Sequence, residues 1–92
     1  MAKVEPVIDN DTVLGYMVMS PATGDMYCFW TKEGNAHVNW NFNGDYEKPN
    51  FRPSMKSETT GEHFFVTDGK IQYLSDCRHS MAGQTVDMVD CE

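Results

Sequence analysis

The sequence predicts a mainly β protein, a small single domain of about six short, largely antiparallel strands joined by hairpins. Composition is the first reason: eight valines stand against two leucines and two isoleucines, with eleven aromatic residues, and such a mixture favours sheets over helix bundles. Strict alternation over 36–42 is the second. An Asp68-Gly69 pair between two β-type runs is the third. Ninety-two residues fit one domain, 1–92.

The N-terminal third predicts a loose entry followed by a hairpin. Residues 1–12 contain Pro6 and the polar stretch 9–12, which are typical of irregular chain. Two apolar runs follow, at 13–19 and 26–30. The residues between them include a proline and a glycine that suit a tight turn, so we expect the two runs to pair.

The middle of the chain predicts one half-buried strand and one irregular segment. In the strand at 36–42, one face carries Ala36, Val38, Trp40 and Phe42, and the other carries His37, Asn39 and Asn41. Asn43 to Asp45 then turn the chain. The segment 46–55 contains Pro49 and Pro53. Because proline cannot donate to a strand ladder, we expect an irregular loop or an edge strand there.

The C-terminal third contains the clearest hairpin signal. Asp68-Gly69 separates the runs 63–67 and 70–74, and this dipeptide readily takes the positive φ angles of a type I′ turn. Residues 80–83 are compatible with one short helical turn, and 84–89 alternate weakly as a last strand.

Charge and cysteine usage restrict the class of protein. Fourteen acidic residues against seven basic ones give a net charge of -7, which argues against the basic face that nucleic-acid binding needs. The charge serves solubility, or it lets the chain compete for a basic site on a host enzyme. There is no apolar run of about 20 residues to span a membrane and no signal peptide. We therefore expect free thiols in a reducing cytoplasm.

Histidine and cysteine offer a candidate metal site. Zinc prefers thiolate and imidazole ligands, and the chain has no Cys-x-x-Cys pair. The hypothesis is that one zinc ion is bound by four residues: His37, His63, Cys77 and His79. The alternative is that these histidines are hydrogen-bonded or lie on the surface, with no cofactor bound.

Other chemistry receives weaker support from the sequence. Cys77 lies two residues before His79, but the neighbouring Asp76 opposes thiolate formation, so a buried thiol is the favoured interpretation. Asn41 to Asp45 lack the glycine and the final glutamate of a calcium loop at the required positions, so a turn is the favoured interpretation. The aromatic side chains expected in the core are Phe29, Trp40, Phe42, Phe64 and Tyr73. The candidate binding residues are Arg52, Asp45 and Trp40.

Three groups of residues carry a resemblance over Met26 to Asp87. They are Phe29-Trp30 with His37, Trp40 to Asp45, Lys48-Pro49 and Phe51 to Ser54; then His63, Phe65-Val66, Asp68-Gly69, Ile71-Gln72, Leu74, Asp76-Cys77 and His79; and finally Ala82 to Asp87. The chain resembles a family of short phage and prophage proteins of unknown function, whose members often carry the label "ammonia monooxygenase".

The resemblance implies a degenerate zinc-ribbon-like domain. Members of that family have a Cys-x-x-Cys after the Phe-Trp pair and a cysteine before the histidine that matches His63. This chain has Thr31, Gly34 and Glu62 at those positions. A four-cysteine zinc site therefore cannot form. A histidine site with Cys77 remains open, and loss of the metal is the simpler hypothesis.

The functional prediction is a small acidic phage accessory protein in the host bacterial cytoplasm. We expect it to act by protein–protein interaction with a host or phage protein, with inhibition of a host or defence enzyme as one hypothesis. The first alternative is a metal-binding protein or metal-dependent hydrolase that uses the His/Cys site. The second is a head-decoration component of the virion. Self-association into a homo-oligomer would be an ordinary way to bury more surface.

Overall fold

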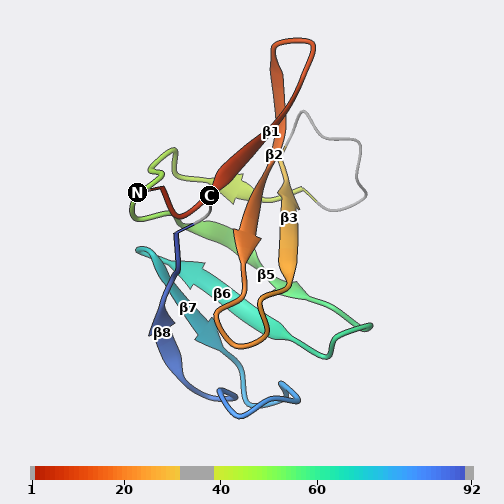
Figure 1. Cartoon of the computed structure of the whole chain (residues 1–92), viewed down its shortest axis with the longest axis vertical. Helices are drawn as coiled ribbons and strands as arrows, with labels where there is room; N and C mark the ends of the chain where they lie inside the picture. Colours follow the sequence, from red (N-terminus) through yellow and green to blue (C-terminus); the bar gives the residue numbers. More distant parts are fainter. Residues whose placement is uncertain (1, 32–38, 91–92) are drawn as a thin grey trace.

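The computed structural model describes residues 2–31 and 39–90, which form two antiparallel sheets (Figure 1). The N-terminal sheet has the order β1-β2-β3, with strands β1 (Glu5–Asp9), β2 (Thr12–Met19) and β3 (Met26–Trp30). The C-terminal sheet has the order β4-β5-β6-β7-β8, with strands β4 (Asn41–Phe42), β5 (Phe51–Lys56), β6 (His63–Thr67), β7 (Lys70–Tyr73) and β8 (Thr85–Asp87). The mainly β prediction is confirmed, with eight strands rather than about six.

The described residues contain no helix. That part of the chain accordingly offers no helix long and apolar enough to cross a membrane. At 80–83, where a helical turn was expected, the chain makes hydrogen-bonded turns: the Ala82 N–H donates to the His79 carbonyl at 3.2 Å, and the Gln84 N–H donates to the Met81 carbonyl at 3.0 Å.

The predicted loose entry is wrong, because Glu5–Asp9 forms strand β1. This strand pairs with β2, and Asp9 lies opposite Thr12. The two residues between them, Asn10 and Asp11, have φ angles of 49° and 63°, the positive values that a two-residue hairpin turn requires. Pro6 is tolerated because β1 is an edge strand. The next hairpin, β2–β3, is confirmed, with Met19 opposite Met26.

Strand β5 corrects the prediction for the segment 46–55. It was expected to be irregular or an edge, yet β5 lies inside the sheet between β4 and β6. The pairing of β5 with β6 shifts register between Phe51 and Met55. Pro53 lies within this irregular stretch, where the ladder does not need a donor. Of the predicted strand 36–42, residues 39–42 are described, and of these only Asn41–Phe42 forms a strand, β4. His37 falls outside the described residues.

The Asp68-Gly69 hairpin is confirmed. Thr67 pairs with Lys70, and the two turn residues have φ angles of 51° and 75°. The predicted last strand is confirmed in a shorter form as β8.

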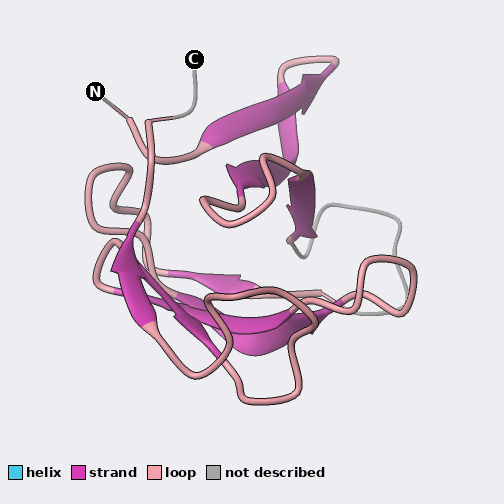
Figure 2. Ribbon diagram, turned by 60° about the horizontal axis from the view of Figure 1, so that its bottom comes forward, coloured by secondary structure: helices cyan, strands magenta, loops and turns pink. Residues whose placement is uncertain are grey.

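The core lies between the two sheets, which form separate layers in Figure 2. Phe51 of the C-terminal sheet stacks on Phe29 of the N-terminal sheet, with ring centroids 4.5 Å apart, and on Phe42 at 4.8 Å. The predicted core aromatics are confirmed: Phe29, Phe64 and Tyr73 are buried, and Trp40 and Phe42 are partly buried against them. The stacked pair of Phe51 and Phe29 therefore joins the layers.

Replacing Phe51 by alanine should lower the free energy of unfolding by about 3–5 kcal/mol, because a fully buried ring is lost from between the sheets. The matched control is Ile8→Ala, since Ile8 is 59% exposed, and its effect should stay within about 0.5 kcal/mol. Urea denaturation monitored by tryptophan fluorescence measures both. Equal effects of the two variants would contradict this core.

Candidate active site

The outer face of the C-terminal sheet is the surface turned away from the core. On β5, Phe51 and Met55 are buried. On β6, Phe64 and Val66 are buried. Alternation along β6 turns His63, Phe65 and Thr67 to the outer face. Between Phe51 and Met55 the pairing of β5 with β6 is irregular, so contacts with β6 place the side chains of β5 on this face. Arg52 contacts Phe65 and Thr67, Ser54 contacts His63, and Lys56 lies opposite His63.

Three polar side chains form a line on this face. Ser54 Oγ lies 3.2 Å from His63 Nε2. On the other side of the ring, His63 Nδ1 lies 3.1 Å from Asp76 Oδ2 and 3.2 Å from Asp76 Oδ1. A hydroxyl, an imidazole and a carboxylate in this order form the arrangement of a Ser-His-Asp catalytic triad.

Sheet pairing brings the serine to the histidine. His63 is the first residue of β6 and lies opposite Lys56 of β5. Ser54 is two residues before Lys56 on the same face, at the distance of a diagonal neighbour. The pair is therefore set by the β5–β6 register.

Cys77 brings the aspartate to the histidine. The His63 N–H donates to Cys77 Sγ at 3.3 Å, and Cys77 Sγ donates to the His63 carbonyl at 3.1 Å. The Leu74 N–H also donates to the His63 carbonyl, at 2.9 Å. These bonds attach the chain after β7 to the start of β6. Asp76, which precedes Cys77, is thereby placed beside the imidazole.

Electrostatics determine which nitrogen of His63 carries the proton. The hydrogen bond from His63 lowers the pKa of Asp76 below its ordinary value of 3.8, and the charges of His63 and Lys56 act in the same direction. An ionised carboxylate only accepts hydrogen bonds, so the proton lies on Nδ1. Nε2 is then free to accept the Ser54 hydroxyl proton. The His63 and Asp76 side chains are 22% and 54% exposed, so this site is open to solvent.

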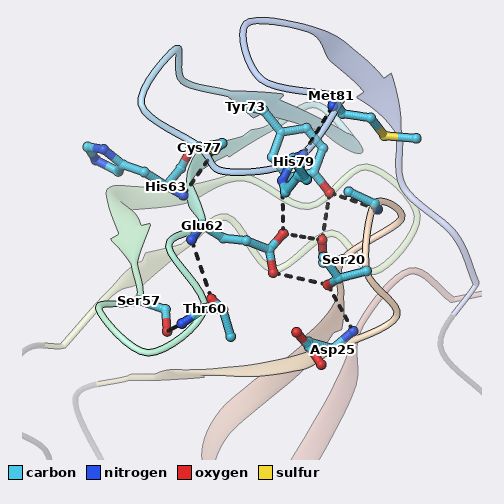
Figure 3. A network of polar contacts seen from close by, with 12 residues as sticks. Ser20, Asp25, Ser57, Thr60, Glu62, His63, Tyr73, Cys77, His79 and Met81 are labelled. Atoms are coloured by element: carbon cyan, nitrogen blue, oxygen red, sulfur yellow. Dashed lines mark hydrogen bonds and ion pairs between the residues drawn. The ribbon is translucent and has the colours of Figure 1, made fainter.

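Behind the triad lies a buried polar network around Glu62 (Figure 3). Glu62 precedes His63, so its side chain points to the opposite face, and in the figure the His63 ring points away from the network. The Glu62 side chain is fully buried. Its Oε1 accepts from Ser20 Oγ at 2.5 Å, and its Oε2 accepts from Thr23 Oγ1 at 3.1 Å. Tyr27 donates its hydroxyl proton to the same Oε2.

Two tyrosines and one histidine complete this network. Burial, followed by the hydrogen bond to Glu62, raises the pKa of Tyr27 to about 12, so its hydroxyl remains a donor at neutral pH. Burial also raises the pKa of Tyr73, whose hydroxyl lies 2.7 Å from Ser20 Oγ. His79 Nε2 lies 3.3 Å from Glu62 Oε1, within ion-pair range but not aligned for a hydrogen bond. The His79 ring packs edge-on against Tyr73, at 4.5 Å.

Most of the chain matches one protein-family model. Residues 6–74 match the model described as "Bacterial ubiquitination-like system serine protease (BubE)". The chain belongs to the BubE family. The matched residues cover about three quarters of the chain and include Ser54 and His63, whereas Asp76 lies beyond them. No curated protein and no solved structure matches the chain. The family description refers to a bacterial ubiquitination-like system, and the resemblance to short phage proteins stays a prediction.

The predicted zinc ligands have separate partners in this BubE-family chain. His63 contacts Ser54 and Asp76, and Cys77 Sγ bonds to the backbone of His63. Nδ1 of His79 accepts the Met81 N–H at 3.1 Å. Within residues 2–31 and 39–90, no group of three or more His, Cys, Asp or Glu side chains is arranged to hold a metal. Because His37 lies outside those ranges, the four-ligand site stays a prediction.

The three candidate binding residues lie in different surroundings. Arg52 is on the outer face, two residues from Ser54. Trp40 donates its Nε1–H to the Ser54 carbonyl at 3.4 Å and lines a surface pocket of about 410 Å³. Asp45 accepts the backbone N–H groups of Glu47 at 2.9 Å and Lys48 at 3.0 Å, bonds that lower the pKa of its carboxyl. Asp45 therefore stabilises its own turn, whereas Arg52 and Trp40 adjoin the triad.

The sequence interpretation missed Ser54 and Asp76. Both stand in the stretches that carried the family resemblance, 51–54 and 76–77. Ser54 lies 9 residues before His63 and Asp76 lies 13 residues after it, and no short sequence motif spans these separations. His63 was identified as a candidate metal ligand. Its place between a serine and a carboxylate follows only from strand pairing and from the bonds of Cys77 to the His63 backbone.

Replacing Glu62 by glutamine should lower the free energy of unfolding by about 2–4 kcal/mol. The new amide group turns a donor toward hydroxyls that donate to the carboxylate and leaves buried groups unpaired. Glu58→Gln is the control, because the Glu58 side chain is 85% exposed, and it should change stability by less than about 0.5 kcal/mol. Urea denaturation of both variants measures the difference. A neutral Glu62→Gln would show that the network does not stabilise the fold.

The Asp76 carboxyl should titrate below 3.8 in the folded protein and return toward that value in His63→Ala, because the hydrogen bond from His63 lowers its pKa. The stabilisation from this pair is present above the unfolded-state pKa and is lost as pH falls through the lower folded-state pKa. Carbon-detected NMR titration of the aspartate carboxyls measures both proteins. An unchanged Asp76 midpoint in the variant would contradict the contact.

Proposed function

We propose that this chain is a serine protease of a bacterial ubiquitination-like system, with Ser54 as nucleophile, His63 as general base and Asp76 as the carboxylate that orients the base. The observation that carries the proposal is the line Ser54 Oγ, His63 Nε2, His63 Nδ1 and Asp76 Oδ2, with distances of 3.2 and 3.1 Å. The description of the BubE family supports it independently.

The geometry gives each residue its step. Ser54 Oγ attacks the carbonyl carbon of a peptide bond while its proton passes to His63 Nε2. The imidazolium is stabilised by ionised Asp76 and returns the proton to the leaving amine. Water then attacks the acyl-serine with His63 again as base, which releases the carboxyl product and restores Ser54. No step uses a cofactor.

The contacts of His63 also distinguish between a catalytic triad and a zinc site. Both ring nitrogens of His63 are engaged by Ser54 and Asp76, which favours a role in a triad over one as a zinc ligand. A protein-interaction role is compatible with the proposal, since a protease of such a system has to bind a protein substrate. Three further proposals do not depend on the triad. They are a host protein as partner, a location in the bacterial cytoplasm, and self-association of the chain into a homo-oligomer.

A fluorophosphonate probe tests the nucleophile without a known substrate. The wild-type protein should be labelled on Ser54, as located by mass spectrometry, and Ser54→Ala should not be labelled. Labelling of His63→Ala should be slower by about a thousandfold or more, and that of Asp76→Asn by about a hundredfold or more, because the activating base is lost or misoriented.

The matched control is Ser80→Ala, which removes an exposed serine outside the triad and should be labelled like the wild type. Circular dichroism and thermal melting confirm that every variant is folded. An unlabelled wild-type protein, or a folded Ser54→Ala that is labelled at the wild-type rate, would overturn the proposal.

A further inference from the structure

The guanidinium of Arg52 is fixed on the outer face of the C-terminal sheet. Its Nη1 donates to the carbonyls of Phe51 at 2.7 Å and Val66 at 3.0 Å. Its Nη2 donates to Thr67 Oγ1 at 2.8 Å. The Cζ atom lies 5.1 Å from the centroid of the Phe65 ring, within the range of a cation–π contact. An exposed arginine normally samples many rotamers, and these four contacts restrict this one to a single orientation.

None of these contacts neutralises the charge of Arg52. Its partners are two carbonyls, one hydroxyl and one ring, and among the described residues no carboxylate forms an ion pair with it. Three of the five guanidinium donors are used. The Nε–H and one Nη2–H take no part in these bonds. A carboxylate can accept charge-assisted hydrogen bonds from such guanidinium donors.

The free donors of Arg52 are close to the proposed nucleophile. Arg52 lies against the Phe65 ring, and Ser54 contacts His63. Phe65 and His63 are two residues apart on the same face of β6, and two residues of a regular strand span about 6.6 Å. An extended peptide has the same rise per residue, so a substrate with its reacting carbonyl at Ser54 would place a side chain within two residues of that bond beside Arg52.

We propose that Arg52, held over Phe65, is the specificity-determining subsite of this protease and binds an acidic side chain, Asp or Glu, within two residues of the bond that is cleaved. The inference rests on the proposed function of the triad. An unpaired, oriented cation on a chain with a net charge of -7 selects acidic substrates locally, whereas the rest of the surface repels them.

Lys56 provides the matched comparison. It lies two residues beyond Ser54 on the same face and carries the same charge. Its side chain is 55% exposed, and its partner Glu58 Oε1 is 3.9 Å away. Lys56 therefore lacks the hydrogen bonds and the aromatic support that orient Arg52. Its loss removes the same charge, including its effect on Asp76, so the comparison depends on the preference between Glu and Gln peptides.

Cleavage of a randomised, N-acetylated peptide library, read by mass spectrometry, tests the subsite. The wild-type protein should cut bonds with Asp or Glu enriched at one position within two residues of the cleaved bond. For the best Glu peptide, Arg52→Gln should lower kcat/KM by about tenfold or more. The same variant should leave the matched Gln peptide unchanged. Lys56→Gln should retain the preference, and Arg52→Lys should retain only part of it.

A binding measurement separates this inference from the proposed function. Ser54→Ala protein labelled with ¹⁵N is titrated with pooled acetylated hexapeptides that carry one Glu, and then with the same pool carrying Gln. The Glu pool should shift the Arg52 Nε–H resonance, and the Gln pool should not. Thr67→Val, which loses one bond that orients Arg52, should weaken the response while the protein stays folded.

The outcomes distinguish a failure of the proposed protease function from a failure of the proposed Arg52 subsite. Absence of Ser54-dependent cleavage would overturn the proposed function, and the resonance titration would then decide the subsite by itself. Ser54-dependent cleavage with equal rates on the Glu and Gln peptides would overturn the subsite and leave the protease. An equal loss on both peptides in Arg52→Gln would also overturn the subsite, because it would mark Arg52 as a support of the sheet.

Discussion

The buried carboxylate of Glu62 is the constraint on which the arrangement of this protein depends. A carboxylate removed from water is stable only when its oxygens are hydrogen-bonded or its charge is paired. Here the partners come from both sheets: Ser20 and Thr23 precede β3, Tyr27 lies on β3, and His79 follows β7. The hydrogen bonds of the Glu62 carboxylate therefore fix how the two sheets pack. The stacking of Phe51 on Phe29 is a second contact between the sheets.

The same requirement positions the triad. Glu62 and His63 are neighbours, so the network that anchors Glu62 on the inner face also anchors the first residue of β6, which presents its imidazole outward. Cys77 completes this support by bonding to the backbone of His63 in both directions. A catalytic group is effective when its supporting residues are rigid, and the start of β6 is held from the inside by the network and from the side by a thiol.

Charge on the outer face follows from the same sheet. The chain is acidic overall, yet Arg52 and Lys56 lie on either side of Ser54 on β5. Of these two cations, Arg52 is the oriented one, through bonds to β5 and β6 and through the ring of Phe65. One strand thus carries both the proposed nucleophile and the group proposed to select its substrates, and the irregular pairing around Pro53 lies between them.

Local signals in the sequence determined the fold class, the β2–β3 and Asp68-Gly69 hairpins and the aromatic core, because turn geometry and two-residue alternation act over a few neighbouring residues. They did not determine β1, because its Asn10-Asp11 turn is a weak signal. They also did not determine that β5 lies inside the sheet, because prolines are typical of edge strands. They also identified His63 without its partners. Only the tertiary structure brings Ser54 and Asp76 to its ring, because the contacts join segments 9 and 13 residues apart through strand register and a thiol. Such long-range pairing leaves no fixed spacing in the chain.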